Sequence, residues 1–73
     1  MNGYKIRYIV EFIRSKGPLP RDVSGDFVSA DDILAWYGLR NRLTLAEQEQ
    51  VKRELEAMME AELFIERLEL SGS

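Results

Sequence analysis

The absence of both cysteine and histidine is the feature that most narrows what this chain can fold into. A chain of 73 residues buries only about 60% of the surface that its unfolded form exposes. Disulfides and zinc sites, which often stabilise such small domains, need the thiols and imidazoles that are missing here. We therefore expect a single domain held together by one thin apolar core, with little volume for a substrate pocket.

The same absence bears on catalysis. Nucleophilic mechanisms that pair serine or cysteine with histidine are excluded. The adjacent carboxylates Asp31 and Asp32 are a remaining candidate for a Mg²⁺ or acid–base site. However, acids in the first turn of a helix are already explained by the helix dipole. The sequence therefore predicts a non-catalytic protein with no metal and no other cofactor.

The chain shows no targeting or membrane segment. No apolar run approaches the roughly 18 residues that span a bilayer. The segment Met1–Arg14 alternates charged and apolar residues and lacks a small-residue cleavage site, so we expect no signal peptide. The lack of cysteine fits a reducing compartment, and the expected location is the cytoplasm.

Charge is distributed unevenly along the chain. Residues 1–43 carry seven basic and five acidic side chains, a net charge of +2. Residues 44–73 carry three basic and eight acidic side chains, a net charge of −5. The acidic run includes Glu54, Glu56, Glu60 and Glu62. We interpret it as a solvated helix face, with a surface for a basic partner as the alternative.

The first helix is predicted over residues 4–15, before Gly17 and Pro18, which end it. It carries two apolar stripes at helical spacing. The aliphatic stripe is Ile6, Ile9, Val10 and Ile13, and the aromatic stripe is Tyr4, Tyr8 and Phe12. One stripe faces the core, and the sequence leaves open which.

A long loop and a short helix are expected next. Residues 17–27 are rich in Pro, Gly and Asp, and Leu19, Val23 and Phe27 can pack this loop down. Residues 26–28 are a candidate short strand. Ser29 followed by Asp32 predicts the start of a helix of two to three turns that Gly38 closes.

The third helix is predicted to begin at Thr44, because Thr44 and Glu47 form a capping box. Its buried stripe is expected at Val51, Leu55, Met58 and Met59. Past Ala61, Glu62 falls on the apolar side, so the helix pattern fails. Residues 63–70 fit either a strand or a further helical segment, with the alternation Leu68-Glu69-Leu70 slightly favouring a strand. Residues 71–73 are expected to be a disordered tail.

The order of these elements resembles a winged helix-turn-helix domain over residues 28–67. The segment 29–35 looks like the start of the helix-turn-helix, and Val51-x-x-Glu54-Leu55-x-x-Met58 looks like the body of a recognition helix. The segment 62–67 looks like the beginning of the wing. The resemblance implies one mainly α, compact three-helix winged-helix-like domain over residues 1–70, with little strand.

This chain departs from the winged helix-turn-helix family in residues that bear on DNA binding. A DNA reader presents basic and amide side chains at the start of its recognition helix, whereas Glu47 and Glu49 are expected there. Phosphates would repel these carboxylates. Sequence-specific DNA binding through residues 44–53 is therefore the alternative function rather than the first.

A second resemblance covers the whole chain. Its size, its helical content and its opening residues 1–10 are similar to a small phage-encoded transcription regulator that binds bacterial RNA polymerase. That resemblance implies a monomer that contacts the N-terminal region of the β′ subunit and the β flap in the bacterial host cytoplasm. It also implies inhibition of host transcription initiation and read-through of terminators, an antitermination activity.

The candidate partner-binding residues are aromatic or basic and lie between residues 4 and 42. They are Tyr4, Arg7, Tyr8, Phe12, Arg14, Trp36, Arg40 and Arg42. Simpler roles compete: the aromatic stripe can pack under the loop 17–27, and Trp36 can anchor the core. The arginines can be ordinary solvated charges, or can neutralise the acidic first turn of the third helix. A dimeric adaptor that buries its spare apolar stripe against its own copy is the third functional class.

Overall fold

The computed structural model describes residues 2–72 as a helical chain. The elements in order are α1 (Asn2–Ser15), α2 (Ala30–Trp36), a single 3₁₀ turn η1 (Arg40–Arg42) and α3 (Leu45–Ser71). Within these residues the one strand-like pairing is an isolated bridge between Arg21 and Phe27. The prediction of a mainly α fold with three helices and little strand is confirmed, and the candidate strand at 26–28 is reduced to this bridge.

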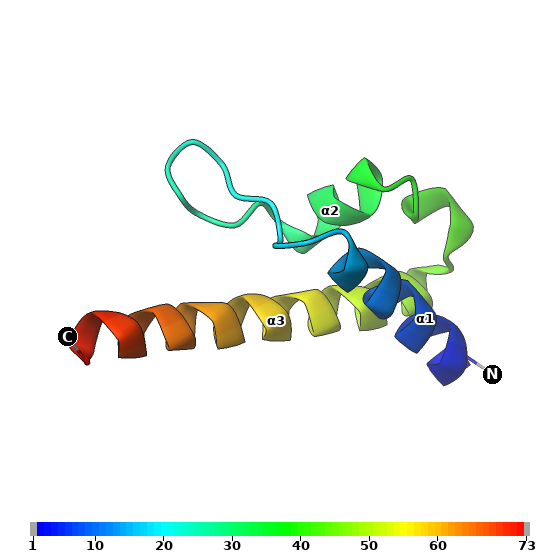
Figure 1. Cartoon of the computed structure of the whole chain (residues 1–73). Helices are drawn as coiled ribbons and strands as arrows, with labels where there is room; N and C mark the ends of the chain where they lie inside the picture. Colours follow the sequence, from blue (N-terminus) through cyan, green and yellow to red (C-terminus); the bar gives the residue numbers. More distant parts are fainter. Residues whose placement is uncertain (1, 73) are drawn as a thin grey trace.

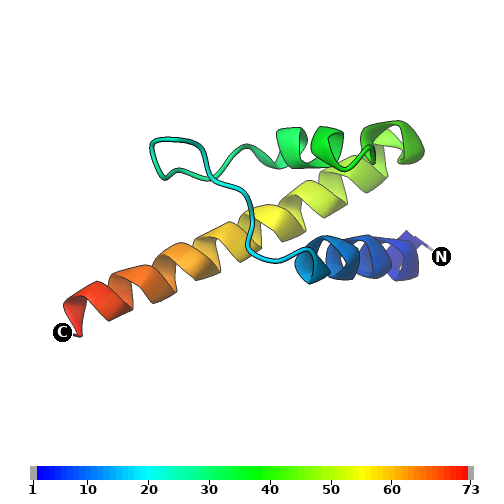
Figure 2. The same ribbon diagram turned by 45° about the horizontal axis from the view of Figure 1, so that its top comes forward.

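Both short helices lie along the first half of α3, as Figures 1 and 2 show. The aliphatic stripe of α1 faces inward, which answers the question that the sequence left open. Val51 and Leu55 of α3 meet it with exposed fractions of 0%. The complete core is Ile6, Ile9, Val10, Ile13, Leu19, Ala30, Ile33, Leu34, Leu43, Val51 and Leu55.

The helix ends follow the capping signals in the sequence. Ser29 Oγ accepts a hydrogen bond from the Asp32 N–H at 3.1 Å and begins α2. Gly38 adopts a φ of 67°, and this left-handed residue lets the Leu39 N–H return to the Leu34 carbonyl. At the start of α3, Thr44 and Glu47 form both bonds of a capping box. These three predictions are confirmed.

The loop between α1 and α2 folds into a small closed turn. The Asp22 N–H donates to the Asp26 carbonyl at 2.7 Å, and Asp22 Oδ1 accepts from two further backbone N–H groups. Leu19 packs into the core and Phe27 packs against it, whereas Val23 is fully exposed. The expectation that Val23 holds the loop down is therefore wrong.

The second half of α3 departs most from the sequence analysis. Residues 63–70 form neither a strand nor the beginning of a wing, because α3 runs without interruption to Ser71. No Gly or Pro breaks the sequence from 45 to 71, and its Leu, Ala, Glu and Arg residues favour helix. The half-exposed carboxylate of Glu66 is paired with Arg21 of the loop, so an acid on the side of the helix that faces the loop is tolerated.

The C-terminal end of the chain differs in part from the disordered tail expected at residues 71–73. Ser71 belongs to α3 and Gly72 caps it, with the Gly72 N–H donating to the Leu68 carbonyl at 2.8 Å. A disordered tail therefore does not begin at residue 71, and Ser73 lies outside the described residues.

Within residues 2–72, no helix is both long and apolar enough to cross a membrane.

The long α3 makes the molecule elongated. A helix of 27 residues spans about 40 Å, which accounts for the longest dimension of 44 Å. The radius of gyration is 13.4 Å, against about 11 Å for a compact domain of this length. Figure 1 shows the C-terminal end of α3 continuing well beyond α1 and α2.

The two halves of α3 are expected to respond differently to truncation of a leucine. Leu55 is fully buried, so Leu55→Ala should lower the free energy of unfolding by about 2–5 kcal/mol. Leu63 is exposed and lies in the second half of α3, which projects beyond α1 and α2 and is called the projecting half below. Leu63→Ala should therefore change the free energy of unfolding by less than about 1 kcal/mol. Urea unfolding followed by circular dichroism measures both. Equal losses would show that the second half packs as tightly as the first.

Candidate protein-binding surface

The aromatic stripe of α1 lies on the outside of the molecule. Tyr4 and Tyr8 have exposed fractions of 80% and 72%, and Phe12 is also exposed. The simpler role expected for this stripe was packing under the loop 17–27. That expectation is wrong for Tyr4 and Tyr8, because the loop instead contacts the far half of α3 through Arg21 and Glu66.

Phe12 connects this stripe to the end of α2. Its ring meets the ring of Tyr37 edge-on, with 5.9 Å between the centroids and an interplanar angle of 79°. Lys16 Nζ lies 4.9 Å from the Phe12 centroid on the same helix. Phe12 is thus held in place, while Tyr4 and Tyr8 continue the stripe into solvent.

Trp36 is the last residue of α2 and precedes Tyr37 in sequence. Its exposed fraction is 71%, so it does not anchor the core. Exposed tryptophan and tyrosine side chains are enriched at the centres of protein interfaces, because they bury a large rigid area at little cost in conformational entropy. The surface residues of α1 and the end of α2 therefore have the composition of a protein-binding surface.

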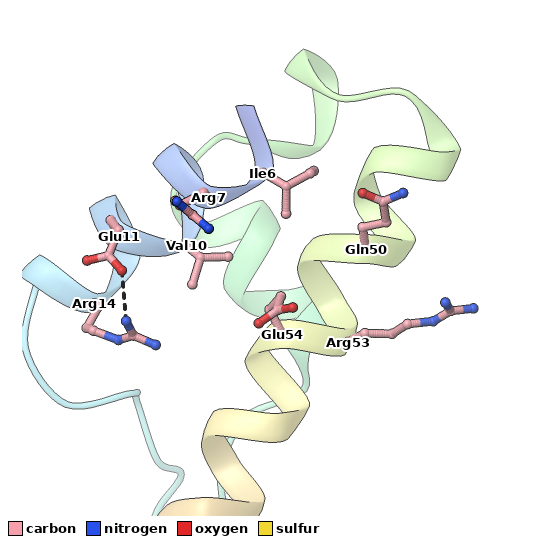
Figure 3. A pocket seen from close by; sticks show the side chains of 8 residues that line it. All are labelled: Ile6, Arg7, Val10, Glu11, Arg14, Gln50, Arg53 and Glu54. Atoms are coloured by element: carbon pink, nitrogen blue, oxygen red, sulfur yellow. Dashed lines mark hydrogen bonds and ion pairs between the residues drawn. The ribbon is translucent and has the colours of Figure 1, made fainter. Parts of the chain in front are cut away.

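Two of the predicted arginines line a groove between α1 and α3. Figure 3 shows Arg7 and Arg14 on α1 facing the groove that α3 completes, with Arg53 running outward from α3. The groove is open to solvent, with a volume of about 600 Å³. Arg14 Nη1 is paired with Glu11 at 2.8 Å, and Glu54 adds a second carboxylate to the lining. Arg53 is not among the arginines predicted for this surface, because only the packing of α1 on α3 brings it there.

The other two predicted arginines lie elsewhere. Arg40 Nε is 3.7 Å from Asp31 Oδ1, and Arg40 borders a separate hollow at the start of α3. Arg42 is exposed, and its carbonyl accepts a hydrogen bond from Lys5 Nζ at 3.5 Å. The four arginines therefore do not line one hollow. Arg40 pairs with an acid of α2 rather than with the first turn of α3.

Asp31 is held by charge pairs on the surface. Besides Arg40, Lys52 Nζ lies 3.9 Å from Asp31 Oδ1. Asp32 contributes its backbone N–H to the Ser29 cap. Among the described residues, no group of three or more potential metal-ligating side chains comes together.

Glu47 is the one buried charged side chain among the described residues, with an exposed fraction of 5%. Its Oε1 accepts from the Thr44 N–H at 2.9 Å and from Lys5 Nζ at 3.3 Å. The Thr44 hydrogen bond, followed by the Lys5 contact, outweighs the opposing effect of desolvation and lowers the pKa of Glu47 below its ordinary value of 4.5. Glu47 was expected on the exposed face, and that expectation is wrong: its carboxylate joins α1 to the start of α3.

This carboxylate is expected to make stability depend on pH. Because the folded-state pKa of Glu47 is lowered, its contribution is present above the unfolded-state pKa near 4.5. That contribution is lost as the pH falls through the folded-state value. Glu47→Gln keeps a side-chain oxygen that can accept the Thr44 hydrogen bond but removes the charge. The variant should have a lower melting temperature than the wild type at about pH 7. Its melting temperature should also fall less than that of the wild type between about pH 5 and pH 3.

Thermal unfolding followed by circular dichroism across this pH range measures the effect. Glu56→Gln, at an exposed position of the same helix, is the matched control and should follow the wild-type curve. If both variants show the wild-type pH dependence, Glu47 does not carry the linkage.

Comparison with known proteins adds no family to this description. The chain matches no protein-family model, no curated protein and no solved structure.

Proposed function

We propose that this chain is a non-catalytic, protein-binding regulator of transcription, phage-encoded, that binds bacterial RNA polymerase. The observation that carries the binding function is the solvent-exposed aromatic stripe of α1, with Tyr4 and Tyr8 exposed along a helix whose other face is in the core. Trp36, at the end of the adjoining helix, adds a third exposed aromatic side chain. The polymerase as partner rests on the resemblance to small phage regulators.

The proposed mechanism is occupation of a polymerase surface without chemistry. Tyr4, Tyr8 and Trp36 supply apolar area, and Arg7 and Arg14 supply cationic groups for an acidic part of the partner. By the same resemblance, the surface contacted comprises the N-terminal region of the β′ subunit and the β flap. Binding there inhibits initiation at host promoters and favours read-through of terminators.

We also propose a helix-turn-helix-like relation between α2 and the beginning of α3, without a wing. The order α2, η1 and α3 supports it, and the helical conformation of residues 63–70 leaves no wing strand. DNA binding remains the alternative function. Because Glu47 turns inward and Glu49 is exposed, only Glu49 of the two expected carboxylates would oppose a phosphate backbone in that alternative.

The test measures binding of the tagged chain to purified bacterial RNA polymerase, free of nucleic acid, by biolayer interferometry. The wild-type protein should bind, and Tyr8→Ala should weaken binding at least about tenfold, as expected for a residue at the centre of an interface. Val23→Ala is the matched control, because it also removes an exposed apolar side chain but lies in the loop. It should bind like the wild type.

The other outcomes are equally informative. Absence of binding to polymerase removes the proposed partner, and full binding by the Tyr8→Ala variant removes the proposed surface. Binding to duplex DNA that falls steeply with added salt would favour the alternative function instead. Circular dichroism of each variant checks that the helical fold is retained.

A further inference from the structure

The projecting half of α3 carries an apolar ridge on the side away from the core. Its residues are Ala57, Ala61, Phe64 and Leu68, and all four are exposed. The intervals of four, three and four residues match the seam of a two-stranded coiled coil, in which such positions face a partner helix. We refer to these four residues as the α3 ridge.

The rest of the molecule leaves the α3 ridge uncovered. The groove between α1 and α3 is lined on α3 by Gln50, Arg53 and Glu54, before the ridge begins, and the loop reaches α3 on another side, at Glu66. The ridge borders a shallow open hollow that includes Ala57, Ala61 and Phe64. A helical segment with this much exposed apolar surface gains little stability from packing within its own chain.

We propose that the α3 ridge pairs in antiparallel orientation with the α3 ridge of a second copy of this chain. The sequence of the ridge is self-complementary in that arrangement. When Ala61 of one copy faces Phe64 of the other, two-fold symmetry repeats the contact, and Ala57 then faces Leu68 at both ends. Every layer therefore sets a small side chain against a large one, as close packing of two helices requires.

The side chains flanking the ridge fit the same register. In an antiparallel pair, Glu60 of one copy lies beside Arg67 of the other, and symmetry forms this ion pair twice. On the opposite flank, Met58 lies beside Ile65 in the same way, which extends the apolar contact. A parallel pair would instead set Ala57 against Ala57 and Phe64 against Phe64. It would also place Glu60 next to Ile65, with neither size nor charge matched.

The antiparallel arrangement also leaves room for the part of each copy that α1, α2 and the first half of α3 form, called its body. In this register residue 71 of one copy lies level with residue 54 of the other, so the two bodies of α1 and α2 sit at opposite ends of the pair. The paired length is about 15 residues, or roughly 22 Å. Such a contact is at the small end of specific interfaces, and a dissociation constant on the order of 1–100 µM is expected.

Reversing the charge of a residue that flanks the ridge tests the proposed dimer. Sedimentation velocity over a concentration series at low salt should show a reversible monomer–dimer equilibrium. Glu60→Lys and Arg67→Glu should each weaken dimerisation about tenfold, because each sets like charges opposite one another twice. A mixture of these two variants should form heterodimers, since opposite charges then face each other in both pairs: the two substituted positions form one pair with reversed polarity, and the unchanged Arg67 and Glu60 form the other. Glu56→Lys is the matched control and should dimerise normally, because it makes the same change on α3 at an exposed position outside the ridge and its flanks.

Cross-linking tests the orientation, and the absence of cysteine from the chain makes single-cysteine variants clean probes. A mixture of the Ser71→Cys and Glu54→Cys variants should form a disulfide faster than either variant alone, since these positions are level in the antiparallel register. Faster linking of Ser71→Cys with itself would establish a parallel pair, and a monomer at all concentrations would refute the dimer. Neither result bears on polymerase binding, which involves α1 and the end of α2.

Discussion

The contact of three helices around Val51 and Leu55 is the constraint on which the rest of the structure depends. Both side chains are excluded from solvent, and the aliphatic residues of α1 and α2 close over them from two sides. With no cysteine to form a disulfide in so small a chain, this cluster supplies most of the apolar burial. It fixes which face of each helix turns inward, and hence which side chains remain for binding.

Two charged contacts extend this arrangement beyond the core. Glu47 completes the capping box of α3 and reaches Lys5 of α1, so one buried carboxylate both starts a helix and joins it to another. Arg21 pairs with Glu66 and lies 4.0 Å from the centroid of the Phe27 ring, which ties the loop to the projecting half of α3. The Glu47 carboxylate is buried and its charge is matched by Lys5, whereas the Arg21–Glu66 pair lies at the surface.

The surface that results has two separate apolar regions. The aromatic stripe of α1 belongs to the body of the molecule, while the α3 ridge lies on a helix that extends past it. The first is rich in tyrosine and borders cationic groups, whereas the second combines small and large aliphatic or aromatic residues with one acid and one base. The two regions therefore differ both in position and in composition.

The sequence by itself determined the three helices, their caps and the aliphatic stripe, because helical spacing and capping side chains act locally. It also supplied the aromatic residues of the candidate surface. Only the tertiary structure decided which stripe of α1 is buried, that Glu47 turns inward, and that Arg53 joins Arg7 and Arg14. The helical state of residues 63–70 was contained in the sequence, because helix-favouring residues continue there without Gly or Pro, although the alternation at Leu68-Glu69-Leu70 favoured a strand. Contacts between distant residues settle which faces turn inward and which side chains share a groove, and no local pattern contains them.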